Sequence, residues 1–124
     1  MSSNPTNTRT AASVATAYFD AWRRNDFDAL QALLADDVEF AGPLGRAHGA
    51  EECRRGLEGL SKIKTDVVPL KRFVEGDDAL TWFELHTTVA PPCPVANWSH
   101  VENGRITRIR VAFDPRPLLD GARG

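Results

Sequence analysis

The sequence predicts a single α+β domain in which helices cover one face of a curved, mainly antiparallel sheet. Apolar residues recur at the three- and four-residue spacing of helices in the first half, and at the two-residue spacing of strands after Ile63. A length of 124 residues suits one domain, and 42% hydrophobic with 26% charged residues is ordinary for a packed globular chain. Helices followed by strands are typical of a two-layer α+β architecture.

Three helices are expected in the first half. The first spans residues 11–24, and its apolar stripe consists of Val14, Ala17, Tyr18, Ala21 and Trp22. The polar pair Asn25-Asp26 interrupts this stripe, so a second helix is expected over residues 27–34. The third begins at residues 49–52, where acidic side chains suit the positive end of a helix, and ends at residues 60–62.

The strands are expected to form hairpins. A short strand at residues 38–41 ends in a turn, and four longer strands follow over residues 65–75, 79–89, 95–102 and 105–114. Gly76-Asp77-Asp78 and Asn103-Gly104 predict hairpin turns, because Gly and Asn tolerate positive φ, and the proline-rich residues 91–94 predict a longer loop. We expect the domain to cover residues 10–116, between a disordered tail at residues 1–9 and a C-terminal tail at residues 117–124.

Composition argues against several classes of partner. The net charge of −2 leaves no basic excess for nucleic acid, and no apolar run is long enough for a signal or a membrane span. Cys53 and Cys93 lie too far apart for a CxxC site and predict free thiols in the cytoplasm. Without metal-ligand spacing or a glycine-rich phosphate loop, neither a metal nor another cofactor is expected.

Several short motifs occur in an order that resembles the nuclear-transport-factor-2-like (NTF2-like) superfamily and, within it, the SnoaL-like group. They are AYFDAW at residues 17–22, NDFDAL at 25–30, LLADDVEF at 33–40, GRAHGAEE at 45–52, VENGRI at 101–106 and FD at 113–114. The resemblance covers residues 11–116 and implies a cone-shaped fold with a pocket between the helices and the concave sheet. Because the superfamily includes isomerases, cyclases, epoxide hydrolases, dehydratases and non-catalytic binders, the fold alone assigns no activity.

Asp114 and His100 are the predicted catalytic pair. The resemblance to SnoaL-like cyclases implies an acidic residue on the last strand and a histidine facing it from the preceding one. A carboxylate in an apolar cavity has a raised pKa suited to proton transfer, and a neighbouring imidazole can relay the proton or stabilise negative charge. The alternative is that Asp114 ends the strand or pairs with Arg116, while His100 lies half-exposed beside Glu102. Regular alternation also turns Asp114 away from the core, so this role requires a β-bulge.

Six further residues are predicted to bind the substrate: Tyr18, Trp22, Phe40, Trp82, His86 and Trp98. Tyr18 and Trp22 lie four apart and face the sheet, and resemblance to ketosteroid isomerase implies that Tyr18 offers its hydroxyl to a carbonyl. Trp82 and His86 alternate along one strand, as Trp98 and His100 do along the next, so these pairs are expected to form one wall of the pocket. The alternative for the aromatic residues is packing in the core or in a dimer.

These observations lead to one expected function and two alternatives. The expected function is that of a cofactor-free isomerase or cyclase, which uses proton transfer on a small, apolar, carbonyl-bearing substrate. The first alternative is a non-catalytic ligand-binding or dimerisation domain. An epoxide hydrolase ranks lower, because the Asp, Arg and Asp constellation of limonene-epoxide-hydrolase-like enzymes is missing. Trp82 and Phe83 further predict a homodimer formed through the outer face of the sheet.

Overall fold

Three helices lie in the first half, and the first two begin at polar caps. The computed structural model describes residues 9–123, so the tail expected at residues 1–9 lies almost wholly outside the described residues. Helix α1 (Ala11–Arg23) begins at Thr10, whose side chain accepts a hydrogen bond from the Ser13 backbone in a capping box. Helix α2 (Phe27–Ala32) is capped by Asp26, and α3 (Ala50–Leu60) follows the second of two short strands.

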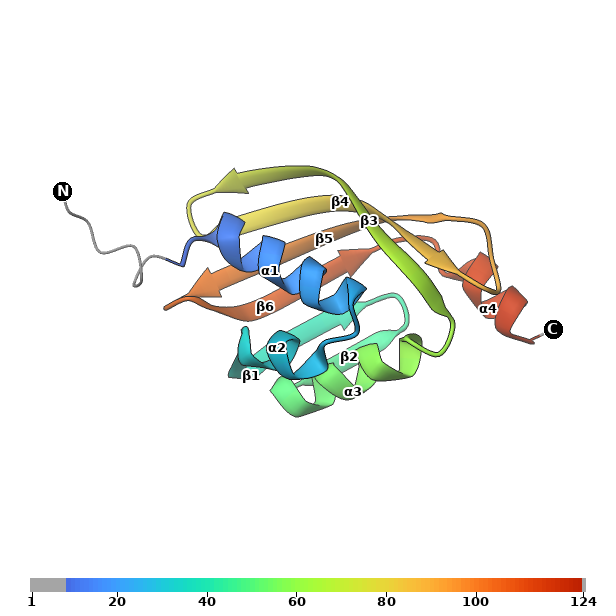
Figure 1. The fold of residues 1–124 in the computed structure, drawn as a ribbon, viewed down its shortest axis with the longest axis horizontal. Helices are drawn as coiled ribbons and strands as arrows, with labels where there is room; N and C mark the ends of the chain where they lie inside the picture. Colours follow the sequence, from blue (N-terminus) through green and yellow to red (C-terminus); the bar gives the residue numbers. More distant parts are fainter. Residues whose placement is uncertain (1–8, 124) are drawn as a thin grey trace.

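Six strands form one curved sheet in the order β2-β1-β6-β5-β4-β3 (Figure 1). Their bounds are Leu34–Gly42 (β1), Gly45–His48 (β2), Lys64–Glu75 (β3), Asp78–Thr87 (β4), Cys93–Glu102 (β5) and Arg105–Ala112 (β6). Strand β1 runs parallel to β6, and the other neighbours are antiparallel. The hairpin turns fall where the sequence predicts them, with positive φ at Gly76, Asn103 and Gly104. The mixed architecture of helices and a mainly antiparallel sheet is confirmed.

Three elements differ from their expected bounds. Strand β1 starts at Leu34, where the sequence predicts the end of the second helix. Leu34 and Val38 are both buried, and a spacing of four residues places two side chains on the same face in a helix and in a strand alike. Strand β2 occupies residues 45–48, where only a turn and the approach to a helix are expected. The expected C-terminal tail forms helix α4 (Arg116–Arg123), in which Leu118 is buried.

Helices α1, α2 and α3 lie on one face of the sheet, and the core fills the space between these layers (Figure 1). Phe83 of β4 packs edge-on against Phe19 and Trp22 of α1, with ring centroids 5.0 and 5.5 Å apart. Phe83 is therefore a core residue, and its expected place on an outer dimer surface is wrong.

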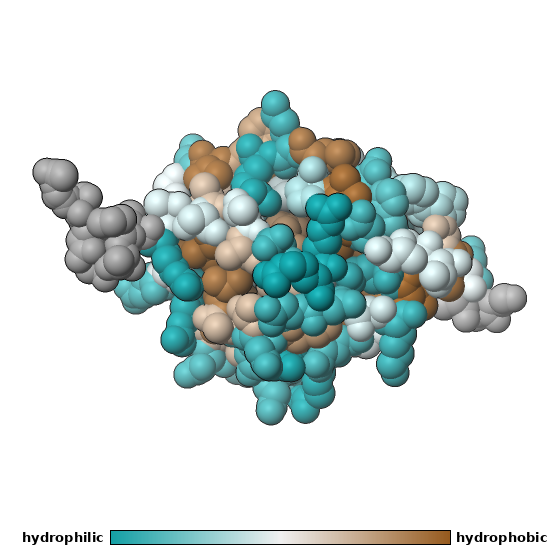
Figure 2. All heavy atoms as spheres, in the orientation of Figure 1, coloured by the Kyte–Doolittle hydropathy of each residue, from teal (hydrophilic) through white to brown (hydrophobic). Residues whose placement is uncertain are grey.

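The outer face of the sheet exposes large apolar side chains. Leu80, Trp82 and Trp98 are each more than 40% exposed, and Phe73 of the edge strand β3 is 59% exposed. From the helix side, hydrophobic residues appear along the margin where β3 runs (Figure 2). None of the helices in the described residues 9–123 is long and apolar enough to cross a membrane.

Candidate functional site

A cavity of about 260 Å³ lies between the helices and the concave face of the sheet. Helices α1 and α3, the β1–β2 hairpin and strands β4 to β6 all contribute to its wall. The lining residues are Tyr18, Trp22, Phe40, Gly42, Pro43, Leu44, Gly45, Arg46, Ala47, Cys53, Gly56, Leu57, Leu60, Phe83, Leu85, Val95, Asn97, Val111 and Phe113.

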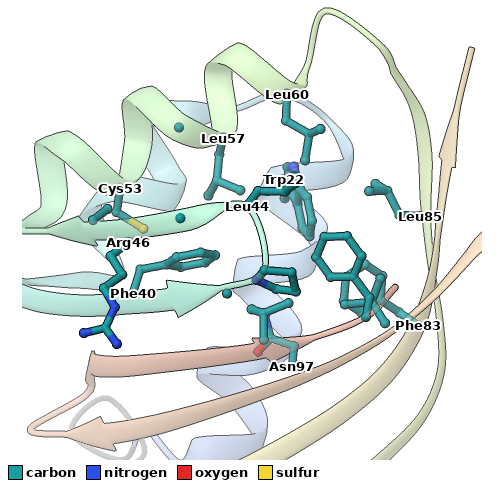
Figure 3. A pocket seen from close by; sticks show the side chains of 18 of the residues that line it. Trp22, Phe40, Leu44, Arg46, Cys53, Leu57, Leu60, Phe83, Leu85 and Asn97 are labelled. Carbon is teal, nitrogen blue, oxygen red and sulfur yellow. The ribbon is translucent and has the colours of Figure 1, made fainter. Parts of the chain in front are cut away.

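Side chains from opposite layers meet in this cavity (Figure 3). Leu57 and Leu60 come from α3, Phe40 from β1, and Phe83 and Leu85 from β4. The lining is therefore largely aliphatic and aromatic. Such a surface favours an apolar ligand, because burying apolar area is the main favourable term in its binding.

Tyr18 and Cys53 are the titratable residues of the cavity whose pKa values depart from their usual range. Burial raises the pKa of the Tyr18 hydroxyl well above 10.0, and the nearby Cys53 raises it further. Burial also raises the pKa of the Cys53 thiol from 9.0 to about 11. Both side chains are therefore neutral at physiological pH, and neither is available as an ionised base or nucleophile.

Arg46 is the charged residue among the lining residues, but its guanidinium does not belong to the interior. Arg46 pairs with Ala41 across the β1–β2 hairpin, and Ala41 pairs with Arg110 across β6. Directly paired residues point to the same face, and Arg110 is paired with the exposed Trp98. The Arg46 side chain thus extends from the outer face, away from Trp22 and Phe83 (Figure 3).

Asp114 does not line the cavity, so its expected placement is wrong. Its carboxylate accepts two hydrogen bonds from the Arg116 guanidinium, both at 2.9 Å, and one from the Arg116 backbone at 3.1 Å. These bonds lower the pKa of Asp114 to about 2, the opposite direction from that needed by a general acid near neutral pH. The sheet does contain a bulge, but it lies at Thr107 and does not turn Asp114 inward.

His100 is also separated from its predicted partner. It pairs with Arg108 across β6, and Asp114 lies six residues further along, about 20 Å away in an extended chain. The His100 ring instead contacts two carboxylates, with Nδ1 2.9 Å from Asp78 and Nε2 3.2 Å from Glu102. The predicted catalytic pair is therefore not brought together.

Trp82, His86 and Trp98 lie on the outer face, so their expected place in the cavity wall is wrong. Along β4 the buried residues are Ala79, Thr81, Phe83 and Leu85, and along β5 they are Cys93, Val95, Asn97, Ser99 and Val101. Period-two alternation then turns the residues between them outward. The Nε1 of Trp98 donates a 2.7 Å hydrogen bond to Asp78, and the Arg108 guanidinium lies over its ring.

Tyr18, Trp22 and Phe40, the other three predicted binding residues, do line the cavity. Their contact with a ligand stays a prediction. Sequence analysis missed Asn97, which also lines the cavity and is 2% exposed. The available signal was that Asn97 shares its strand face with the apolar Val95 and Val101, so a polar side chain is placed among core residues.

The histidines and their carboxylates are placed outside the cavity. His48 contacts Glu39, His86 lies 3.1 Å from Glu84, and His100 contacts Asp78. Among residues 9–121, no three His, Cys, Asp or Glu side chains form a group that could hold a metal ion.

Comparisons with known proteins agree with this architecture. A profile of the SnoaL-like domain matches residues 15–109. A protein of Kribbella flavida DSM 17836 is 31% identical, with a TM-score of 0.85 over 94% of this chain and 95% of that one. No protein of curated function matches the sequence.

Two further solved structures carry a described activity. An LEH-like epoxide hydrolase of Mycobacterium tuberculosis is 25% identical, with a TM-score of 0.75 over 92% of this chain and 90% of that one. A proposed polyketide cyclase of Sinorhizobium meliloti is 27% identical, with a TM-score of 0.74 over 79% and 92% of the two chains. With the profile match covering most of its length, the chain belongs to the SnoaL-like domain family, within the NTF2-like fold.

Proposed function

We propose that this protein binds a small, predominantly apolar molecule in the cavity without transforming it. The observation that carries the proposal is the composition of the wall, in which aliphatic and aromatic side chains surround a few neutral polar groups. A volume of about 260 Å³ corresponds to about nine water molecules at liquid density, so the ligand is a compact one.

A proton-transfer enzyme needs an acid or base within hydrogen-bond reach of the substrate. Neither a carboxylate nor an imidazole is among the lining residues, and burial keeps Tyr18 and Cys53 neutral. Epoxide opening needs a carboxylate and a positioned water, and the same composition argues against it. The activities of the M. tuberculosis and S. meliloti proteins are therefore not carried over to this chain.

The catalytic alternative is an isomerase or cyclase acting on a carbonyl-bearing substrate. The observation that favours it is that Tyr18, whose buried hydroxyl is neutral, is one of the lining residues. Such a donor can polarise a carbonyl, but the partner that would remove or deliver a proton is missing from the lining residues.

A binding experiment with a filled cavity tests the proposal. Ala47 lines the cavity, and Ala47→Phe places a ring in it. Ala41 pairs with the outward-facing Arg46, so Ala41→Phe adds the same ring to the opposite face of the hairpin and is the matched control. We expect the bicyclic hydrocarbon tetralin to bind the wild type and the control in ligand-observed NMR, and to lose most of its binding to Ala47→Phe.

Two outcomes would contradict the proposed binding function. If tetralin and its oxygenated derivatives show no saturable binding to the folded wild type, the cavity is not a ligand site. If Ala47→Phe and Ala41→Phe bind equally well, the ligand occupies another part of the molecule.

A further inference from the structure

The cavity reaches the surface between the tip of the β1–β2 hairpin and helix α3. Of its lining residues, those exposed to solvent are residues 43–46 of the hairpin and Gly56 of α3. The lining residues that come from α1, β4 and β5 are all buried. A ligand that arrives from water therefore meets the hairpin and α3 before it meets the deeper parts of the wall.

Helix α3 presents a stripe of residues to the cavity, and one position of this stripe has no side chain. The stripe consists of Cys53, Gly56, Leu57 and Leu60, at three- and four-residue spacing. Leu57 extends from α3 toward the hairpin (Figure 3). At Gly56, in contrast, an added Cβ would meet no atom of the surrounding described residues within 4 Å. Gly56 thus leaves a gap at the exposed margin of the stripe.

The hairpin tip forms the other side of this opening. Gly42 pairs with Gly45 at the end of the hairpin, and β1 pairs with β6 as far as Ala41. The two turn residues Pro43 and Leu44 lie outside these strand pairings, so displacing them breaks none of the pairings. The tip is therefore the part of the cavity wall that can move at the lowest cost.

Leu44 is the apolar side chain at that tip. It lines the cavity and is 52% exposed, so it belongs partly to the cavity wall and partly to the surface. Turning more of this side chain toward the apolar lining removes it from water, which is favourable. In the absence of a ligand, Leu44 is therefore expected to rest over the opening.

We propose that ligands enter the cavity between the hairpin tip and α3, that Gly56 sets the width of this entrance, and that Leu44 closes it. Leu44 has to move aside for entry and for exit. This inference rests on the proposed binding function and adds to it a route and two residues that control access.

Modification of Cys53 tests the entrance without a ligand. Cys53 lies in the cavity wall, whereas Cys93, the other buried thiol, does not line the cavity and serves as the internal reference. Methyl methanethiosulfonate is small and uncharged, and it transfers a methylthio group to a thiolate with release of methanesulfinate. The reaction is run at about pH 9, because burial raises the pKa of Cys53 to about 11, and is followed by mass spectrometry of the two cysteine peptides.

Gly56→Leu is the blocking variant, and Gly59→Leu is its matched control. Both glycines are exposed positions of α3 where an added Cβ meets no atom of the surrounding described residues within 4 Å, but Gly59 does not line the cavity. The gain in helix propensity is the same for both variants, so it does not contribute to a difference between them. We expect Gly56→Leu to slow the modification of Cys53 at least about 10-fold relative to Gly59→Leu, with equal rates for Cys93. Equal Cys53 rates in the two variants overturn the proposed entrance.

Leu44→Ala tests the closing role from the other side of the opening. Its control is Leu70→Ala, because Leu70 is 53% exposed on β3 and does not line the cavity. Leu44→Ala should speed both the modification of Cys53 and the association of tetralin several-fold, and Leu70→Ala should leave both rates unchanged. An unchanged Cys53 rate in Leu44→Ala, or faster dissociation of tetralin without faster association, overturns the role of Leu44 in closure.

The thiol rates separate this inference from the binding function. If they change as expected but tetralin does not bind, the entrance is supported and the proposed function fails. If tetralin binds and Gly56→Leu slows neither its association nor the modification of Cys53, the function stands and the entrance is overturned.

Discussion

Replacing Tyr18 by Phe should make the ligand-free protein more stable. The substitution removes only the hydroxyl, and the ring keeps its edge-on contact with Phe19 at a centroid distance of 5.3 Å. That hydroxyl is buried, and none of the described residues is its hydrogen-bond partner. An unsatisfied buried polar group costs about 1–3 kcal/mol.

The expected gain is about 1–2 kcal/mol, because the residues around a cavity can relax and recover part of the cost. For a chain of 124 residues, 1 kcal/mol corresponds to about 4 °C in melting temperature, so Tm should rise by about 4–8 °C. Differential scanning calorimetry of ligand-free wild type and variant at equal concentration measures this directly.

A Trp22→Phe variant is the informative companion. It also removes an unpartnered donor, but it deletes part of a large ring that packs against Phe83, and such truncations usually destabilise. A lower Tm for Trp22→Phe with a higher Tm for Tyr18→Phe fits the structure. A lower Tm for Tyr18→Phe refutes the reasoning, since it means that the hydroxyl is satisfied in the ligand-free protein.

Three other predictions follow from the placement of charges and apolar groups. Probe affinity should stay constant from about pH 5 to 9, because the raised pKa values keep the cavity neutral; a bell-shaped dependence contradicts this. The Cys53 pKa is raised in the folded state from 9.0 to about 11, so its stabilising contribution is complete below about pH 9 and is lost as pH rises to about 11. The free energy of unfolding should fall by about 3 kcal/mol at most over this range. Denaturant titrations at alkaline pH should show this fall for the wild type but not for Cys53→Ala, and the same pH dependence in both proteins contradicts the prediction. We also propose a homodimer through the outer face, so Leu80→Glu should give a monomer mass in light scattering while Arg55→Glu on α3 should not; a monomeric wild type contradicts the dimer.

The sequence was sufficient for the three N-terminal helices and for the hairpin turns of the second half, because their signals are local. Thr10 and Ser13 form a capping box within one turn, and Asn103 and Gly104 adopt the positive φ that their turn requires. The family resemblance rested on the order of such segments and was confirmed by the profile match. None of these features depends on which face of a strand meets the core.

The faces of the strands could not be assigned from alternation alone. In β4 both faces carry large apolar side chains, Leu80 and Trp82 on one and Phe83 and Leu85 on the other, although the first face also contains Asp78, Glu84 and His86. Packing against α1 decides between them, since Phe83 contacts two aromatic rings of that helix. Because the inner and outer faces of β4 were exchanged in the prediction, Trp82 and His86 were assigned to the cavity wall. The same exchange in β5 assigned Trp98 to it.

The bulge in β6 shows why a more careful reading of alternation would still fail. Ile106 and Ile109 are both buried although they are three residues apart, which a regular strand does not allow. The extra residue at Thr107 restores the inward phase for Ile109 and for the cavity-lining Val111. Its position depends on the register with β5, a long-range property that a sequence pattern does not reveal.

The distribution of polar groups between the two faces bears directly on function. Carboxylate and imidazole pairs such as His100 with Asp78 lie on the outer face, where they are hydrogen-bonded to each other. On the inner face, Arg72 of β3 binds Thr16 and Thr81 and does not line the cavity, whose lining includes the uncharged polar residues Tyr18, Trp22 and Asn97. A reaction by proton transfer would require the reverse arrangement, with a titratable group inside and its pKa near neutrality. Neither a carboxylate nor an imidazole is among the described lining residues, and this distribution is what supports the binding function proposed above.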